Sequence, residues 1–87
     1  MWMNGISPFI NLPETAQPDA VIAECLKHTV KTYKIIQMRE VKIHIQIRGA
    51  REEFHAALVD SDLGKKIVLF QYQGSTVGWW TRVYDVK

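Results

Sequence analysis

Hydrophobic and polar residues alternate without interruption along residues 41–48, Val-Lys-Ile-His-Ile-Gln-Ile-Arg. Val41 and the three isoleucines that follow fall on one side, and four polar residues fall on the other. Successive side chains of a β-strand point to opposite faces, and β-branched residues pack well on a pleated surface. The pattern therefore predicts a strand at the centre of a sheet, with the aliphatic side buried and the polar side exposed.

A helical pattern precedes this strand and predicts a helix over residues 18–34. Pro18 suits the first helical position, where its missing N–H is not needed. Ile22, Leu26 and Tyr33 recur at helical spacing and form one apolar stripe. We expect this stripe to cover the aliphatic face of the alternating strand.

A basic strip lies opposite the apolar stripe of the predicted helix. Positions i, i+4 and i+7 of a helix share one side, and lysines of this kind usually form a solvated face. Their functional interpretation is a contact with phosphates or with an acidic partner. The strip consists of Lys27, Lys31 and Lys34.

The segment 50–60 has two interpretations. Strong helix formers, together with Phe54, Ala57 and Leu58 at i, i+3 and i+4, favour a second short helix. The rival interpretation is a strand that turns at 61–64 into the next strand. We favour the helix because paired alanines and paired glutamates fit a strand less well, and the strand stays open as the alternative.

The end of the chain predicts a β-hairpin, with strands over 67–73 and 77–86 joined by a turn at 74–75. The last strand carries bulky residues on both sides. If the side of the last strand that carries Trp79 faces inward, its opposite side faces outward. Three residues of that opposite side then join the polar side of the alternating strand on the outer face. The resulting set is Trp80, Arg82, Tyr84, Lys42, His44, Gln46 and Arg48.

Together these elements predict a single α+β domain over residues 1–87, built as a two-layer sandwich. Its antiparallel sheet has three or four strands, with one long helix over 18–34 and, in the favoured interpretation, a short one over 50–60. Residues 1–17 form an apolar, irregular arm interrupted by prolines, with a short edge strand predicted over 9–12. The arm either packs on its own core, which we favour, or docks on another chain.

Composition changes this picture little. A net charge of +2 permits an anionic partner without implying one, and 47% hydrophobic residues are ordinary for a folded domain. A lone cysteine, Cys25, cannot form an internal disulfide and indicates a reducing compartment, so we expect a cytoplasmic protein. The sequence has neither a signal-peptide pattern nor the run of about 18 apolar residues of a membrane span, so no membrane contact is expected.

No motif indicates catalysis, a metal or a cofactor. His28, His44 and His55 lack the paired spacing of zinc ligands, and Cys25 lies on the apolar stripe of its helix, which is typical of a core residue. We therefore expect a protein that is not an enzyme.

The aromatic and basic sheet face supports a functional hypothesis. Trp, Tyr and Arg are the residue types that anchor protein contacts. The hypothesis is a small regulatory or inhibitory module that binds a partner protein, or a second copy of itself, through this face. The alternative is single-stranded nucleic-acid binding, with bases stacked on Trp80 and Tyr84 and phosphates met by Arg82, Arg48 and Lys42.

Overall fold

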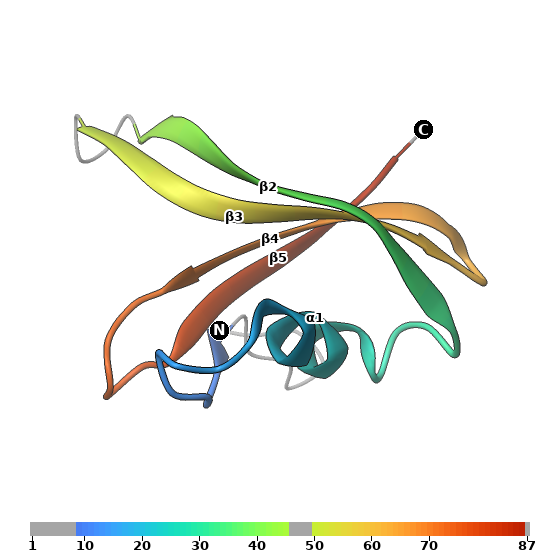
Figure 1. Cartoon of the computed structure of the whole chain (residues 1–87), viewed down its shortest axis with the longest axis horizontal. Coiled ribbons are helices and arrows are strands. Elements are labelled where there is room, and N and C mark those ends of the chain that lie inside the picture. The colour runs from blue at the N-terminus through green and yellow to red at the C-terminus, as the bar shows by residue number, and fades with distance from the viewer. Residues whose placement is uncertain (1–8, 46–49, 87) are drawn as a thin grey trace, which may run out of the picture.

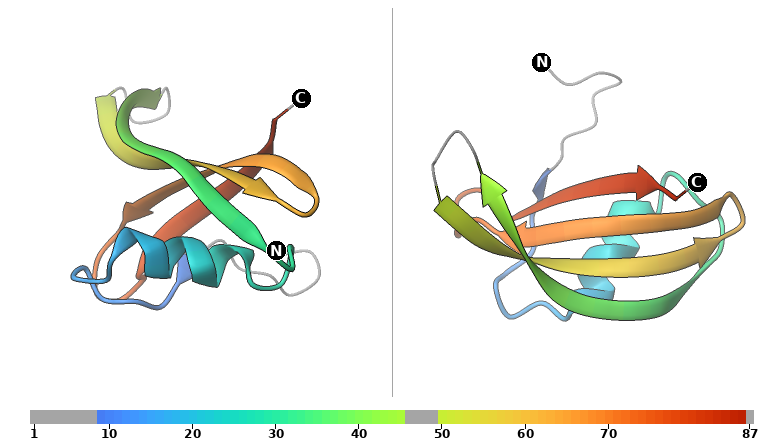
Figure 2. Two further views of the ribbon diagram at one scale, coloured as in Figure 1. Left: turned by 45° about the vertical axis from the view of Figure 1, so that its right-hand side comes forward. Right: turned by 90° about the horizontal axis from the view of Figure 1, so that it is seen from above.

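The computed structural model describes residues 9–45 and 50–86. Five strands form one antiparallel sheet in the order β1-β5-β4-β3-β2, and the helix α1 crosses one of its faces (Figure 1). We call the opposite face, turned toward the viewer in the right panel of Figure 2, the open face. The elements are β1 (Phe9–Ile10), α1 (Pro18–Leu26), β2 (Tyr33–Ile45), β3 (Ala50–Ser61), β4 (Gly64–Tyr72) and β5 (Trp79–Asp85).

The predicted fold class is wrong in both layers: the sheet has five strands rather than three or four, and α1 is short. The helix begins at Pro18, as expected, but ends at Leu26 instead of Lys34. β-branched residues that favour extended backbone follow it, among them Val30. No helix in the described part of the chain is long and apolar enough to cross a membrane.

A carboxylate from a distant turn helps the chain leave the helix. Asp62, between β3 and β4, accepts hydrogen bonds from the backbone N–H groups of Lys31 (2.9 Å) and Thr32 (3.2 Å). These two N–H groups would otherwise point back along a continued helix. The bonds instead hold the start of β2 beside the β3–β4 turn, so Tyr33 pairs with Ser61 as the first step of the β2–β3 ladder.

The segment 50–60 is strand β3, and the helical prediction for it is wrong. β3 pairs with β2 on one side and with β4 on the other, so both neighbours satisfy its backbone. Tertiary pairing of this kind overrides the modest helix preference of its alanines and glutamates. Ala57 and Val59 are buried on the α1 side, whereas Ala56 and Leu58 lie on the open face. The rival prediction, a strand that turns at 61–64, is the correct one.

A β-bulge in β2 reverses the predicted faces of the alternating stretch. Ile35 pairs with Val59, but Gln37 pairs with the next residue of β3, so Ile36 is an extra residue without a counterpart. Ile35 therefore packs against the core on the α1 side, whereas Val41 pairs with Phe54 and lies on the open face.

Two predictions about the alternating stretch are thus wrong. Its aliphatic side, represented by Val41 and Ile43, does not lie under the helix, because the bulge shifts its register by one residue and exchanges the two faces. β2 is also an edge strand, and the centre of the sheet is β4. Ile47 lies outside the described residues.

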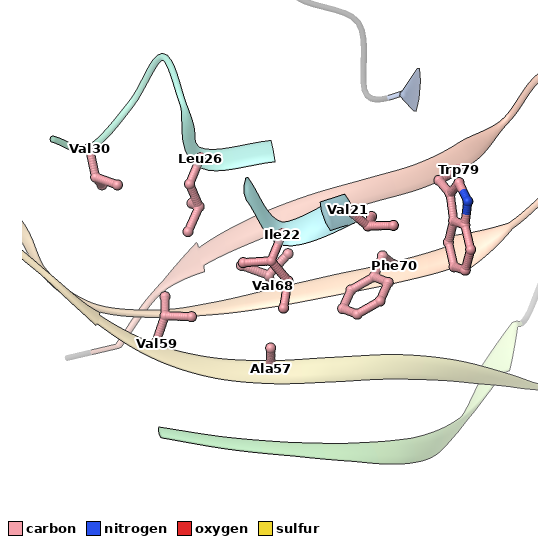
Figure 3. Packing of buried hydrophobic residues seen from close by; sticks show 9 residues of the cluster. All are labelled: Val21, Ile22, Leu26, Val30, Ala57, Val59, Val68, Phe70 and Trp79. Carbon is pink, nitrogen blue, oxygen red and sulfur yellow. The ribbon is translucent and has the colours of Figure 1, made fainter. Parts of the chain in front are cut away.

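The core lies between α1 and strands β3, β4 and β5 (Figure 3). Ile22 lies over Val68, and Val21 lies near Phe70, all four with no exposed surface. Burying an aliphatic side chain of this size stabilises a fold by about 1.5–3 kcal/mol. The complete cluster is Val21, Ile22, Leu26, Val30, Ala57, Val59, Val68, Phe70 and Trp79.

The short strand β1 is held in place by β5 and by the turn that precedes β5. Phe9 pairs with Trp80, and the indole Nε1 of Trp79 donates a hydrogen bond of 3.0 Å to the carbonyl oxygen of Pro13. Gly78 has φ +89°, and a Cβ there would lie 2.2 Å from the carbonyl oxygen of Ile10. Only glycine therefore lets β1 approach β5 this closely. The edge strand predicted over 9–12 is confirmed for Phe9–Ile10 only, because the chain leaves the sheet at residue 11.

We expect Phe70→Ala to lower the free energy of unfolding by about 3–5 kcal/mol, since it opens a cavity beneath α1. Ile67→Ala, on the open face of the same strand, is the matched control and should cost about 1 kcal/mol or less. Urea unfolding of both variants measures the difference. Equal losses of unfolding free energy in the two variants would contradict the assignment of the α1 side as the buried face.

Asp62 predicts a pH dependence of stability. Hydrogen bonds that Asp62 accepts from backbone N–H groups hold the pKa of its carboxyl below the usual value, and the bond from Thr32 has the largest effect. Its stabilisation is therefore complete above the unfolded-state pKa of about 3.9 and is lost as pH falls through the lower folded-state pKa. Asp62→Ala should lower the melting temperature at pH 7, and the gap to the parent should close in this acidic range.

Asp62→Asn provides the control, because its amide oxygen can accept the same bonds without titrating. Its melting temperature should stay closer to that of the parent, and the remaining gap should also narrow toward low pH. A gap between Asp62→Ala and the parent that stays constant from pH 7 down to pH 2 would contradict this role.

Candidate interaction face on the sheet

The open face is built from rows of side chains that the strand register brings side by side. One row runs across four strands from Arg39 through Ala56 and Leu69 to Arg82. Directly paired residues of antiparallel strands share a face, and neighbouring strands lie about 4.8 Å apart. The row therefore places one guanidinium-bearing residue at each end of a small apolar centre.

A second row lies beside the first, toward the β3–β4 turn. It runs from Gln37 through Leu58 and Ile67 to Tyr84. Ile67 is 36% exposed and Tyr84 is 43% exposed, so large apolar groups of this row remain in contact with water. The open face is consequently apolar over its middle strands, although no helix of residues 9–45 and 50–86 covers it (Figure 2).

Two hollows lie on this face and meet at Leu69. The larger has a volume of about 470 Å³, and the smaller has a volume of about 330 Å³. Phe9, Ile43, Phe54, Leu69, Gln73, Trp80, Arg82 and Tyr84 line the larger hollow. Gln37, Arg39, Val41, Ala56, Ala57, Leu58, Ile67 and Leu69 line the smaller one.

Aromatic contacts fix the shape of the larger hollow. The rings of Phe54 and Trp80 meet edge to face, with centroids 5.6 Å apart. Phe54 is buried and Trp80 is half-buried, so the pair forms a firm wall. The guanidinium carbon of Arg82 lies 5.8 Å from the centroid of the Tyr84 ring, which holds this cation over an aromatic face.

Hydrogen bonds position the polar end of the same hollow. The side-chain amide of Gln71 donates to the backbone oxygen of Glu53 (2.9 Å) and to the carboxylate of Glu52 (3.3 Å). Gln73 donates in turn to the side-chain oxygen of Gln71. This chain of bonds ties the end of β4 to β3 beside Trp80, so the wall and its polar margin belong to one hydrogen-bonded part of the sheet.

The structure brings together only part of the predicted binding set. Trp80, Arg82 and Tyr84 share the open face, as predicted. Lys42 pairs with Glu53 and lies on the α1 side, because the bulge has exchanged the faces of β2. His44 belongs to β2, but its side chain lies outside the description, and Gln46 and Arg48 fall outside the described residues.

The predicted basic helix face does not form. Lys27 is the C-cap of α1 and pairs with Glu24 at 2.7 Å. Lys31 lies in the connection after the helix, and Lys34 lies in β2, where it pairs with Asp60. The three lysines have no common helix side because α1 ends at Leu26, before all three of them.

Sequence reasoning missed several residues that line the larger hollow. Ile43 was assigned to the buried side, and Phe54 was read mainly as part of a helix. Alternation of Phe54, Ala56 and Leu58 was the signal that could have placed them on one sheet face. No pattern along the chain would have placed Phe9 beside Trp80, since that neighbourhood depends on strand order.

Other chemistry-bearing groups do not assemble a second site. Burial raises the pKa of the Cys25 thiol, and a weaker opposing effect comes from its hydrogen bond with Thr81. A raised thiol pKa leaves little thiolate at neutral pH. Over residues 9–45 and 50–86, no three His, Cys, Asp or Glu side chains are placed to hold a metal ion.

Comparison with models of known protein families, with curated proteins and with solved structures gave no match to this chain.

Proposed function

We propose that the chain is a small non-enzymatic module that binds a partner protein through the open face of its sheet. The observation that carries this proposal is the hollow of about 470 Å³ formed between the Phe54–Trp80 wall and Tyr84, with Arg82 at its margin. A rigid aromatic wall beside an arginine is the composition of energetic centres in protein interfaces.

The chemistry of the face indicates what the partner presents. The middle of the face is apolar through Leu58, Ile67 and Leu69, and Arg39 and Arg82 stand at the ends of one row. A protein segment with a large apolar side chain and a neighbouring carboxylate complements both features. Its apolar group would fill the hollow, and its carboxylate would meet a guanidinium.

The alternative, single-stranded nucleic acid, retains some support from Trp80, Tyr84 and Arg82 on one face. Bases can stack on exposed aromatic rings, and arginine can contact phosphate. The apolar middle of the face and the position of Lys42 on the other side favour a protein instead, since protein surfaces that bind nucleic acid are strongly basic.

A module of this size would act by covering or bridging a surface of its partner, which is how a regulator or inhibitor without chemistry of its own works. We place this activity in the cytoplasm, because the single cysteine is half-buried in the core and suits a reducing compartment.

A displayed library of random peptides tests the proposal. Selection on the wild-type chain should enrich peptides that combine a large apolar residue with Asp or Glu. Trp80→Ala should bind the enriched peptides at least about 30-fold more weakly, the effect of losing about 2 kcal/mol at an interface centre. Fluorescence anisotropy of labelled peptides measures the affinities.

Lys65→Ala is the matched control, because this exposed residue lies at the beginning of β4 and outside both hollows. It should bind the peptides as the parent does. Enriched peptides that bind the parent and Trp80→Ala equally would contradict the proposed face. A labelled oligothymidine that binds at low salt, and is lost in Trp80→Ala, would support the nucleic-acid alternative instead.

A further inference from the structure

A long strand edge ends the sheet on the side of β2. The strand order places β2 last, and the right panel of Figure 2 shows it as the outermost strand of the sheet. Among the described residues, β2 pairs only with β3, so its other edge has no strand beside it. Beyond the bulge at Ile36 the register with β3 is regular from Gln37 to Ile45. An edge of this length is a template for another strand.

The charges on this edge are of mixed sign. Proteins commonly block an edge with proline or with lysines that repel a second copy. β2 contains no proline. Glu40 and Lys42 lie two residues apart, so both project on the α1 side, where they are exposed. When a second copy pairs with this edge, some registers set like charges opposite each other and repel it. Another register sets Glu40 opposite Lys42 and attracts it.

Geometry restricts which registers two copies can adopt. Two identical antiparallel strands are related by a two-fold axis, and directly opposite residues must project on the same face. The axis must therefore lie midway between one residue and the same residue of the second copy, on which the register is centred. Centring on Arg39, Glu40 or Lys42 sets that charged residue against its own copy. Centring on Val41 sets Glu40 opposite Lys42 of the second copy, and this attractive pair occurs twice.

Side chains of β3 extend the match. Glu53 pairs with Lys42, and His55 pairs with Glu40, with 3.7 Å between its Nδ1 and a carboxylate oxygen of Glu40. In the register centred on Val41, a row across the junction reads Glu53, Lys42, then Glu40 and His55 of the second copy. Each carboxylate in this row has a lysine or histidine as its neighbour, and the Lys42 side chains of the two copies lie in different rows.

We propose that two copies of this chain pair antiparallel through β2, with Val41 opposite Val41, and join their sheets into one. This assembly uses the sheet edge rather than the hollows, so it goes beyond the proposed function. The smaller hollow includes Arg39 and Val41, so the open faces of the two copies become continuous at the two-fold axis. A pair of linked binding faces would gain avidity for a partner with two sites.

Charge exchange tests the pairing. Sedimentation velocity should show a dimer for the parent, and Lys42→Glu and Glu40→Lys should each weaken dimerisation at least tenfold, because each creates like-charge pairs. An equimolar mixture of these two variants should form heterodimers, and the double variant should regain the dimer. Trp80→Ala, which alters only the open face, should dimerise as the parent does.

A parent that sediments as a monomer at several hundred micromolar would overturn the proposal, and so would a mixture that fails to associate. Circular dichroism of each variant checks that the sheet is retained. A dimer that survives both single substitutions and is lost in Trp80→Ala would place the contact on the open face and would also overturn the pairing through β2.

A cross-link tests the register. In a Cys25→Ser background, Val41→Cys should form an intermolecular disulfide on mild oxidation, because opposite residues of paired strands lie within the reach of a disulfide. Ile43→Cys is the control and should not cross-link, since residue 43 lies opposite residue 39 in this register. Equal cross-linking of the two variants, or none in Val41→Cys, would contradict the register.

Discussion

The packing of Val21, Ile22 and Leu26 of α1 on the middle strands sets the arrangement of the rest of the molecule. A helix of nine residues is about 13 Å long, so it can exclude water from only one face of a five-stranded sheet. Phe70 and Trp79 complete the core on that side. Among the described elements, none covers the second face of the sheet or the long edge of β2.

This division explains why so small a domain combines a dense core with exposed apolar surface. A chain of this size buries only about 60–65% of its unfolded surface, and its stability rests on few residues. The open face adds aliphatic and aromatic groups that the fold does not bury, among them Tyr84 and Ile67. Contiguous apolar surface of this kind is the feature on which the proposed binding role rests.

The sequence predicted most where local chemistry alone decides. Pro18 marked the beginning of the helix, and the bulky residues of the last strand divided between two faces, with Trp79 buried and Trp80 on the open side. The sheet face with Trp80, Arg82 and Tyr84 could therefore be anticipated. The helix end could not, because the backbone N–H groups that follow it donate to the carboxylate of Asp62, which lies far away in the chain.

The remaining failures share one physical cause, which is the pairing of strands over long range. Helix-forming residues in 50–60 became an interior strand because two neighbours supply its hydrogen bonds. Strand order put β2 at the edge and β4 in the middle, and no periodicity encodes that order. The faces of Val41 and Lys42 were exchanged by one extra residue that alternation alone does not reveal.

That extra residue has an evolutionary consequence. Ile36 lies before residues 37–45 of β2. Its presence therefore sets whether the aliphatic or the charged side of these residues faces away from the helix. A single codon gained or lost here would exchange the two surfaces without altering the composition of the strand. One insertion or deletion at this position would thus give a chain with nearly the same sequence and a different molecular exterior.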